Sequence, residues 1–600
     1  MSRGPSRRSF LAGTAGMASL GMFGLLGSAC RSHLSLDPRV SGRRTGAFAD
    51  WSLITPQDEL LTTARTEVVI VGSGYGGAVS AARLAAGGAK VMVLERGLEW
   101  LPGDFPETMY QLSSATRQRD PLELFDLYTP MGGDLDIIAG SGIGGTSLIN
   151  AAISTRPPDI VLEQPQWPAA IRAAHADGSL ARYYDRAAAV LQPNQFAGED
   201  PAKVAMHRAL AATIADGGEF QYLPLNISYQ AARRGDPQRP VQQHACALCG
   251  NCTTGCNVGA KSTLQANYLP MARAKGASIF AGVEVDRIER AGATWRVHYT
   301  ARSKGERITG AILADRVIVA ASSLGSTEVM MRSAAAGLAV SPALGTRVST
   351  NGDMLGFCYN GDAPTNLVGR RPDRVAEPVG TALMGVIDYR GVHAHGPRLE
   401  DSFLLLEGTI PVALGGAVAK ALAAYAHGQA RELTTDQLDR LRLDLDAPDG
   451  YHPDGALAHS TLYLACGHDD SGGRYVYRAG DRPQIVWPHV GESPFVPTIE
   501  AEMRRYTERR GGMFFRNPRS VLFGGRLIVP HPLGGCPMAD DARAGVVDHY
   551  GRVFDNAGGV HRGLHVLDGS TIPRSLAATP LLTISALAER ASEAILAGNA

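Results

Sequence analysis

Four cysteines that fall within eleven residues form the clearest ligand pattern in the sequence. Cys246, Cys249, Cys252 and Cys256 follow one another at intervals of three, three and four residues. This spacing is typical of the ferredoxin loop that holds an iron–sulfur cluster, so we expect a [4Fe–4S] or [3Fe–4S] cluster here. The alternatives are a structural zinc site, which usually takes two separated cysteine pairs, and local disulfides, which gain little stability from such short loops.

A histidine near the C-terminus is the first candidate for acid–base chemistry. His531 begins the segment His-Pro-Leu-Gly-Gly-Cys, and a neutral imidazole can accept a hydroxyl proton near neutral pH. Gly534 and Gly535 let the backbone pass close to a bound group. We therefore expect His531 to act on a bound substrate, either as a base or by positioning a hydroxyl group.

Glu407 is the second candidate, because it is the one carboxylate in an apolar run from Ser402 to Gly408. A buried carboxylate is costly unless it is paired or used, and burial raises its pKa. The sequence thus predicts a functional carboxylate, with an outward-facing strand residue as the alternative.

A dinucleotide-binding unit must position this chemistry, and its pattern lies near the start of the chain. Residues 68–71 form an apolar run typical of a strand that is buried on both faces. Gly-Ser-Gly-Tyr-Gly-Gly follows, then an alanine-rich helix pattern through Ala86, then a second apolar strand, 91–94, which ends at Glu95. This is the G-x-G-x-x-G motif in its strand–turn–helix setting.

Each glycine of that motif, and the acidic residue that follows it, has a physical task. Gly72 allows the tight turn, Gly74 lets the backbone approach a pyrophosphate, and Gly77 permits close packing of the helix on the strand. Glu95 can accept hydrogen bonds from the ribose hydroxyl groups. The motif alone does not distinguish FAD from NAD.

Further segments point to FAD. They are a second glycine-rich loop at 140–150 and three C-terminal stretches at 531–536, 567–573 and 579–590. Together with the first motif, they resemble the glucose–methanol–choline (GMC) family of FAD oxidoreductases, and most closely its cholesterol oxidase branch. The resemblance covers most of the chain in discontinuous pieces.

The resemblance implies an α/β fold with two domains. A Rossmann-like FAD-binding domain would be built from the discontinuous segments 66–158, 240–335 and 525–600. A substrate-binding domain, with a sheet capped by helices, would comprise 159–239 and 336–524. The flavin would lie along Gly142, Gly145 and Asn150, the adenine near Val285, and the ribityl–phosphate end near Asp568 and Gly569.

The resemblance also implies a reaction. A secondary alcohol, which we expect to be a sterol or a similar hydrophobe, would transfer a hydride to flavin N5 while His531 acts as base or positioner. One alternative is a dehydrogenase for another alcohol or sugar that passes electrons through the iron–sulfur cluster. Another is steroid oxidation with a double-bond isomerisation that depends on Glu407, and a third is a non-catalytic flavin electron carrier.

Thr579 departs from the family, which has histidine or asparagine at this second active-site position. Threonine before Pro580 is also a good N-cap followed by proline at the first helical position. We expect Thr579 to cap a helix that runs toward Gly598, and its contact with a substrate hydroxyl stays open.

The N-terminus predicts export. Arg7 and Arg8 precede a glycine-rich apolar run at 12–29, so we interpret residues 1–30 as a twin-arginine signal and residues 31–65 as a lead-in. This route carries folded proteins and suits a chain that receives its cofactor in the cytoplasm. The mature protein would be periplasmic, cell-surface or secreted, and lipidation at Cys30 stays open.

Composition limits the partners. Lys and Arg number 58, as do Asp and Glu, and a zero net charge argues against nucleic-acid binding. The expected partners are the hydrophobic alcohol and either oxygen or an acceptor such as a cytochrome or quinone. The apolar stretch 411–428 is predicted to be a helix, either packed in the substrate domain or forming a lid with peripheral membrane contact.

Overall fold

The computed structural model describes Arg39 and residues 45–600, except for 131–133, 215–217, 232–239, 304–305, 392–398, 429–432, 448–449, 479–481 and 518–526. The predicted export signal at 1–30, with Cys30, lies outside the described residues. Within the described part of the chain, no helix combines the length and the apolar character that crossing a bilayer requires.

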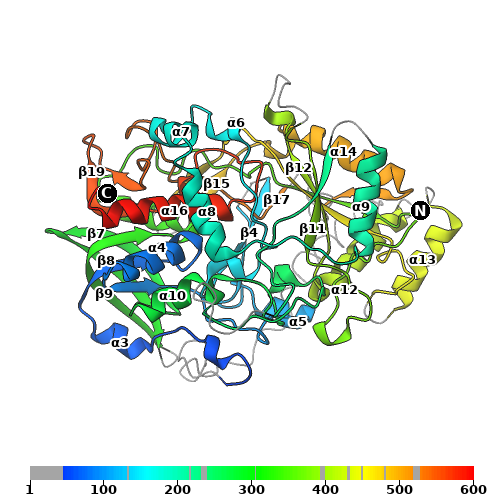
Figure 1. Cartoon of the computed structure of the whole chain (residues 1–600), viewed down its shortest axis with the longest axis horizontal. Coiled ribbons are helices and arrows are strands. Elements are labelled where there is room, and N and C mark those ends of the chain that lie inside the picture. Colours follow the sequence, from blue (N-terminus) through cyan, green and yellow to red (C-terminus); the bar gives the residue numbers. More distant parts are fainter. Residues whose placement is uncertain are drawn as a thin grey trace, which may run out of the picture.

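An eight-stranded sheet forms one end of the molecule (Figure 1). Six strands lie in the order β18–β19–β9–β1–β2–β6, and the pair β7–β8 joins at β9. β1 is parallel to both its neighbours, β2 and β9. The strands are β1 (Arg65–Val71), β2 (Val91–Leu94), β6 (Ser278–Phe280), β7 (Val283–Ala291), β8 (Thr294–Ser303), β9 (Glu306–Val319), β18 (Arg552–Phe554) and β19 (Val560–Val566).

The predicted strand–turn–helix–strand unit is confirmed as β1, α4 (Tyr75–Ala86) and β2. α4 packs against α10 (Tyr268–Ala274) and α16 (Leu581–Leu596). α4 also lies close to the turn that precedes it, since a Cβ on Gly77 would lie 2.1 Å from the backbone oxygen of Gly72. Segments from both ends of the chain therefore meet around the first glycine motif.

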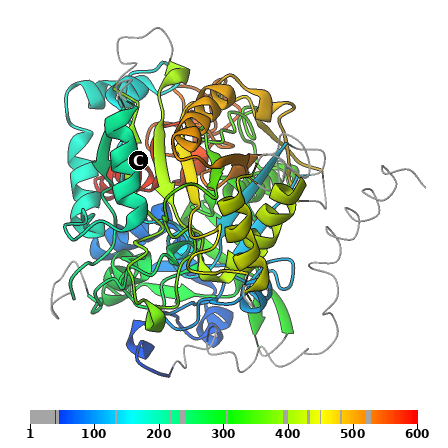
Figure 2. The same ribbon diagram turned by 90° about the vertical axis from the view of Figure 1, so that its right-hand side faces the viewer.

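A six-stranded antiparallel sheet forms the other end, in the order β16–β10–β13–β12–β11–β5. α9 (Ala202–Thr213) and α14 (Phe495–Arg509) pack on it. Figure 2 looks onto the molecule from the side on which these helices lie in Figure 1. The strands are β5 (Glu219–Tyr222), β10 (Met354–Tyr359), β11 (Leu383–Asp388), β12 (Leu404–Gly408), β13 (Thr461–Cys466) and β16 (Met513–Arg516).

Alternation along β13 separates the two faces of this sheet. Tyr463 and Ala465 belong to the core that includes residues of α9 and α14, whereas Leu462 and Leu464 line the large cavity described below. Successive strand side chains point to opposite faces. One face is therefore covered by helices and the other forms a cavity wall.

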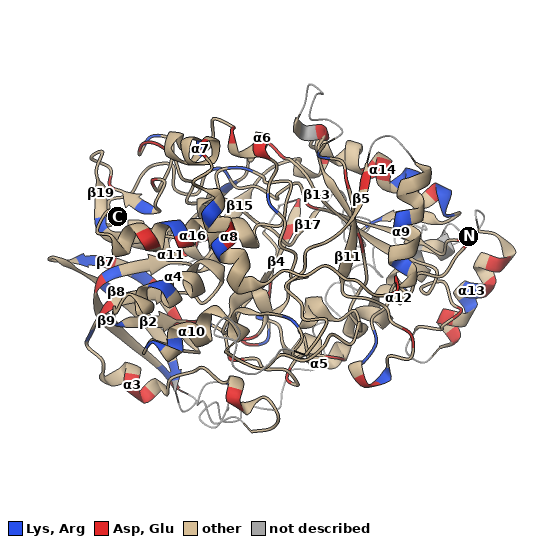
Figure 3. Ribbon diagram, in the orientation of Figure 1, with Lys and Arg blue, Asp and Glu red and all other residues tan. Residues whose placement is uncertain are grey.

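Smaller elements connect the two ends. β17 (Leu527–Val529), β4 (Leu135–Gly140) and β3 (Phe125–Tyr128) form a three-stranded sheet, and β14 (Arg474–Val476) pairs with β15 (Gln484–Val486). The remaining helices are α3 (Gln57–Thr62), α5 (Met109–Ser114), α6 (Asp159–Leu162), α7 (Ala169–Ala176), α8 (Ala181–Leu191), α11 (Ser322–Ala335), α12 (Val412–Gly428) and α13 (Thr435–Asp446). Basic and acidic residues are interspersed along the elements (Figure 3).

The apolar stretch after Pro411 is helical, as predicted, and forms α12. Ala419, Leu422 and Ala426 of this helix are buried in a core cluster with strands of the six-stranded sheet, while Leu414 lines the large cavity. α12 is thus both a packed helix and part of a cavity wall.

Candidate active site

A cavity of about 520 Å³ is lined by elements of both sheets. The carboxyl ends of β1 and β2 contribute Val71 and Leu94, and the first glycine motif continues the wall. In parallel α/β sheets this edge is where ligands bind. Every FAD-contacting residue expected from the sequence lines this cavity except Gly77 and Gly142: Gly72, Gly74, Glu95, Gly145, Asn150, Val285, Asp568 and Gly569.

The three glycines of the first motif have different surroundings. Gly72 has a φ of +93°, and a Cβ there would lie 2.5 Å from the backbone oxygen of Ala320. Gly77 lies against Gly72, as described above. A Cβ on Gly74, in contrast, would meet no atom within 4 Å. Gly72 and Gly77 therefore serve the turn and the packing, while Gly74 leaves open space beside the cavity.

Glu95 joins the two glycine-rich loops. Its carboxylate accepts hydrogen bonds from the backbone N–H and the hydroxyl of Ser73, at 3.0 and 2.7 Å, and from the backbone N–H of Gly142, at 3.3 Å. A Cβ on Gly145 would lie 3.0 Å from the Cα of Gly74, so the loops also touch directly. Gly142 does not line the cavity and donates to Glu95, and its expected contact with the flavin stays a prediction.

Two further expected cofactor residues are held by hydrogen bonds. Asn150 donates from Nδ2 to the hydroxyl of Tyr75 at 2.9 Å. Asp568 accepts from the hydroxyl of Ser326 and from the backbone N–H of Ser570. Burial raises the pKa of Asp568, and these hydrogen bonds act in the opposite direction. Both side chains are thus fixed at the cavity wall before any ligand binds.

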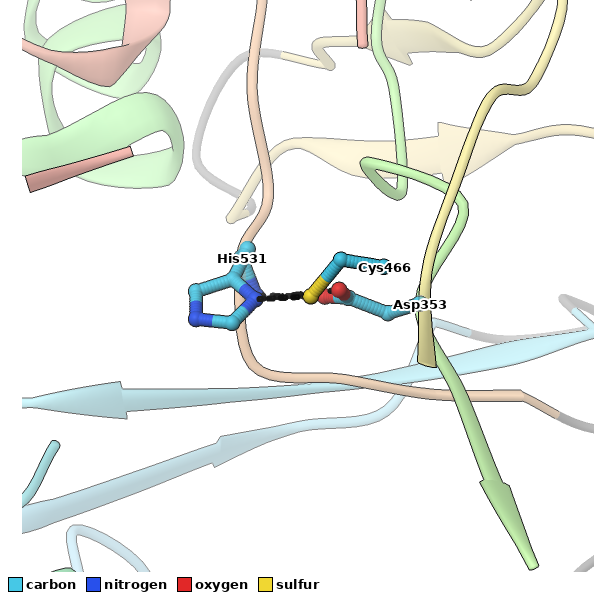
Figure 4. Close-up of side chains that lie close together, drawn as sticks. All are labelled: Asp353, Cys466 and His531. Atoms are coloured by element: carbon cyan, nitrogen blue, oxygen red, sulfur yellow. Dashed lines mark hydrogen bonds and ion pairs between the residues drawn. The ribbon is translucent and has the colours of Figure 1, made fainter. Parts of the chain in front are cut away.

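His531 lines the large cavity, and two buried side chains lie beside its ring (Figure 4). Its Nδ1 is 3.0 Å from Oδ1 of Asp353, and its backbone N–H donates to Oδ2 of the same residue at 2.9 Å. The sulfur of Cys466 lies 3.9 Å from Nδ1. Asp353 and Cys466 are fully buried, and burial together with Asp353 holds the pKa of the Cys466 thiol well above its ordinary value.

Thr579 lines the cavity, but it does not cap the helix, so that expectation is wrong. α16 begins at Leu581 with Pro580 as its N-cap residue and without a side-chain cap. The hydroxyl of Thr579 instead donates to the backbone oxygen of Ile153 at 2.7 Å, and its N–H donates to the hydroxyl of Thr155 at 3.0 Å. These partners draw the side chain away from the helix N–H groups.

The structure also corrects the expectation for Glu407. In β12 it pairs with Tyr463, which lies on the helix-covered face of the sheet, so Glu407 points away from the cavity. Its carboxylate forms a 2.7 Å ion pair with Lys203 of α9 and accepts from the backbone N–H groups of Met384 and Gly385. Burial raises the pKa of Glu407, and Lys203 opposes this shift. The geometry gives Glu407 a partner in the core and no access to a substrate.

The four clustered cysteines surround a second, small cavity of about 20 Å³. None of the seven described cysteines forms a disulfide. Thr253 and Thr254, which lie between Cys252 and Cys256, line the large cavity instead. The loop is therefore a wall shared by the two cavities. The cysteines are Cys246, Cys249, Cys252 and Cys256.

Two buried lysines, out of six in the chain, flank this loop. Lys261 donates to the backbone oxygens of Leu148, Asn150 and Cys252 at 2.8 to 2.9 Å, and it forms no ion pair with a carboxylate among the described residues. Lys203, the partner of Glu407, also donates to the backbone oxygen of Thr381, which lines the small cavity. Burial lowers the pKa of Lys261 to about 8, and the charges of Cys252 and Cys256 act against this shift.

Sequence reasoning missed Asp353, Lys203 and Lys261. Asp353 and His531 are 178 positions apart, and no local pattern links them. Lys261 had a weak signal, since it follows Cys256 by five positions in a lysine-poor chain.

The fold and the cavity define a flavin-dependent oxidoreductase, and comparison with known families agrees. Residues 66–351 match the N-terminal domain and residues 525–588 the C-terminal domain of the GMC oxidoreductases. The chain belongs to the GMC oxidoreductase family, whose members bind FAD, and it is an oxidoreductase that acts on CH–OH donors.

Two sequence relatives and one solved structure show how similar the chain is to individual proteins. The chain is 26% identical over 563 residues to a cholesterol oxidase of Acinetobacter baumannii, covering 88% of this chain and 93% of that protein. It is 30% identical over 236 residues to a long-chain-alcohol oxidase of Arabidopsis thaliana, covering 37% of this chain and 27% of that protein. The structure of pyridoxine 4-oxidase from Mesorbium loti superposes with a TM-score of 0.56 at 18% identity, over 88% of this chain and 99% of that one, and shows the shared fold.

The walls of the large cavity fit FAD. The first turn of α4 has no side-chain cap, so its N–H groups are available to phosphate oxygens. Gly74, with free space where a Cβ would stand, allows that approach. Val285 would contact the adenine, and Asn150, Asp568 and Gly569 would hold the flavin end.

Proposed function

We propose that the protein oxidises a secondary alcohol that is a sterol or a similarly hydrophobic molecule. The observation that carries this proposal is the wall that the six-stranded sheet contributes to the large cavity. Its strands present only aliphatic side chains there, and His531 lines the same cavity. An apolar wall in the same cavity as an imidazole that can accept a proton suits an apolar substrate with a reacting hydroxyl. The wall residues on the strands are Leu355, Leu383, Leu462 and Leu464.

The oxidation removes a hydride from the carbinol carbon and a proton from the hydroxyl group, and bound FAD supplies the hydride acceptor. His531 takes the hydroxyl proton on Nε2, the ring nitrogen that does not face Asp353 (Figure 4). The leucine wall excludes water and holds the carbon skeleton. Leu414 extends this apolar wall onto α12.

Anaerobic mixing with a panel of alcohols tests this function. Cholesterol, a long-chain alcohol and a small sugar would be added separately to FAD-loaded protein, and the loss of flavin absorbance would be followed. We expect bleaching by the hydrophobic alcohols, and His531→Ala should slow it about 10²- to 10⁴-fold while FAD stays bound. Bleaching by the sugar alone would contradict the substrate class, and no bleaching by any alcohol would favour an electron carrier.

We also propose that the four clustered cysteines hold a [4Fe–4S] or [3Fe–4S] cluster. Burial raises the pKa of the Cys246 thiol, and the hydrogen bond that its sulfur accepts from the backbone N–H of Leu248 at 3.4 Å acts in the opposite direction. Lys261 is a buried cation without a carboxylate partner among the described residues, and thiolates would supply its missing negative charge. A zinc–thiolate site would satisfy the same charges, so the metal must be identified directly.

The wall shared by the two cavities supports a function for such a cluster. Electrons would leave the flavin one at a time through the cysteine loop to an acceptor such as a cytochrome or quinone, rather than to oxygen. Iron, zinc and acid-labile sulfide would be measured on anaerobically purified Cys249→Ala, with Cys358→Ala, a buried cysteine of another core, as control. We expect loss of iron and sulfide only in Cys249→Ala. Unaltered protein with zinc, or with no metal, would contradict the cluster.

We propose export by the twin-arginine route, which rests on Arg7 and Arg8 in the sequence alone. The location of the mature protein would be periplasmic, cell-surface or secreted. Replacing both arginines with lysine should leave the protein in the cytoplasm in a fractionation experiment. Unchanged export of that variant would contradict the assignment.

A further inference from the structure

A buried carboxylate makes two hydrogen bonds to the residue that we place at the reacting hydroxyl. Asp353 immediately precedes β10 and has no exposed surface. Its Oδ2 accepts from the backbone N–H of His531 at 2.9 Å, and its Oδ1 lies 3.0 Å from Nδ1 of the same residue. One carboxylate thus holds both the backbone and the ring of His531.

This arrangement determines where the imidazole carries its proton. A carboxylate only accepts hydrogen bonds, so the Nδ1 facing it is the protonated nitrogen. Nε2 then has a lone pair, which a general base needs. Figure 4 shows the ring with Nδ1 toward Asp353 and Cys466 and with the other nitrogen turned away from both.

The other groups around Nδ1 do not replace this carboxylate. Cys466, at the end of β13, is 3.9 Å from Nδ1, and burial together with Asp353 keeps its thiol protonated. Arg390, which acts on Cys466 from the end of β11, is itself paired with Asp388 at 2.7 Å. Asp353 is therefore the anion in contact with the ring.

We propose that Asp353 is a positioning residue that keeps the proton of His531 on Nδ1, aims Nε2 into the cavity and stabilises the imidazolium formed there. The hydroxyl proton of the alcohol moves to Nε2, and Asp353 takes no proton in this step. The inference rests on the proposed role of His531 in alcohol oxidation.

Asparagine is an informative replacement, because it has nearly the same shape but only one acceptor oxygen. In Asp353→Asn, the two donors of His531 compete for that oxygen, and the negative charge is lost. Cys466→Ala is the matched control, since it alters a buried neutral neighbour of the same nitrogen. Each variant would be studied with bound FAD, by anaerobic flavin reduction with a saturating alcohol over a range of pH.

We expect Asp353→Asn to keep its FAD and to reduce flavin about 10²-fold more slowly or worse. Because asparagine carries no charge, the pH profile of flavin reduction in Asp353→Asn should also differ from that of the unaltered protein. Cys466→Ala should change the rate by no more than about twofold and leave the pH profile unchanged, as expected for removal of a neutral neighbour.

Two results would overturn the proposal. One is a normal rate and a normal pH profile in Asp353→Asn, and the other is an equal effect of Cys466→Ala, which would indicate packing rather than charge. If Asp353→Asn does not fold, ¹⁵N NMR of histidine-labelled unaltered protein decides the question, with the signal of His531 assigned by His531→Gln. A proton on Nδ1 supports the proposal and a proton on Nε2 refutes it. Normal flavin reduction by His531→Ala would instead refute the proposed function itself.

Discussion

The carboxylate of Glu407 and the ammonium of Lys203 form an ion pair of 2.7 Å, and both side chains are almost completely buried. The pair joins β12 to α9 on the helix-covered face of the six-stranded sheet. Each charge needs the other as a partner, because an unpaired charge in this interior would strongly destabilise the folded protein. The pair is therefore a structural joint behind the cavity wall.

Glu407→Gln should destabilise the protein without impairing alcohol oxidation. Removing one partner of a buried ion pair costs about 3 to 5 kcal/mol, whereas the carboxylate has no access to the cavity. Adding Lys203→Met should restore part of this loss, since the uncompensated ammonium disappears with it. Denaturant unfolding of both single variants and the double variant measures the coupling. A normal stability of Glu407→Gln combined with lost flavin reduction would return Glu407 to the active site.

Gly74→Ala should weaken FAD binding while the apoprotein stays stable. Gly74 has φ −67° and ψ −171°, which any residue adopts, and an added Cβ meets no protein atom. That methyl group would occupy space that the pyrophosphate needs, so we expect affinity for FAD to fall about tenfold or more. Gly76→Ala is the contrasting variant, because its Cβ would lie 1.5 Å from the backbone oxygen of Leu567. FAD titration and apoprotein melting temperatures should separate the two, and unchanged FAD affinity in Gly74→Ala would contradict this placement of the cofactor.

Thr579→Val should affect stability more than catalysis. The hydroxyl of Thr579 already donates to the backbone oxygen of Ile153, and the loss of that bond costs about 1 to 3 kcal/mol. Thr579→Ser keeps the donor and should remain close to the unaltered protein. If flavin reduction by the substrate drops by orders of magnitude in Thr579→Val but not in Thr579→Ser, then the hydroxyl also orients the alcohol.

Local patterns in the sequence predicted the β1–α4–β2 unit and the grouping of the four cysteines, because in each case the interacting residues are close along the chain. On which face of the six-stranded sheet Glu407 lies could not be predicted from local patterns. Residues 403–406 are all apolar and buried, since that strand is covered on both sides. A strand of this kind lacks the alternation that assigns a residue to a face.

Long-range pairs were equally beyond a reading of the sequence. Asp353 follows a glycine in an ordinary loop before β10, and its partner His531 comes from the last part of the chain. The hydroxyl of Thr579 was assigned to the nearest helix because N-caps are local, yet a segment 426 positions away supplies its acceptor. Tertiary contacts therefore decided these two roles.

Acidification should destabilise the protein through buried neutral histidines, and His565 is the clearest of them. It is fully buried in β19, and neither ring nitrogen has a hydrogen-bond partner among the described residues. Burial lowers the pKa of His565 to about 3. The unfolded chain, with an ordinary pKa of about 6.5, binds a proton below that pH while the folded protein does not. The free energy of unfolding should therefore fall by about 1.4 kcal/mol per pH unit for this residue between about pH 6.5 and 3, and stay constant above that range.

His565→Leu should remove this slope and leave stability at pH 7 unchanged or higher, because it eliminates a buried polar group without partners. His489→Asn is the control, since His489 is exposed and asparagine tolerates its φ of +60°. Denaturant unfolding at pH 7, 6 and 5 measures the difference, with pH values chosen across the window given by the two pKa values. Below about pH 6.5, the free energy of unfolding should fall in parallel in the unaltered protein and in His489→Asn. In His565→Leu it should fall by about 1.4 kcal/mol less per pH unit, which is the contribution of one proton. Parallel loss in all three proteins would show that His565 is protonated in the folded state.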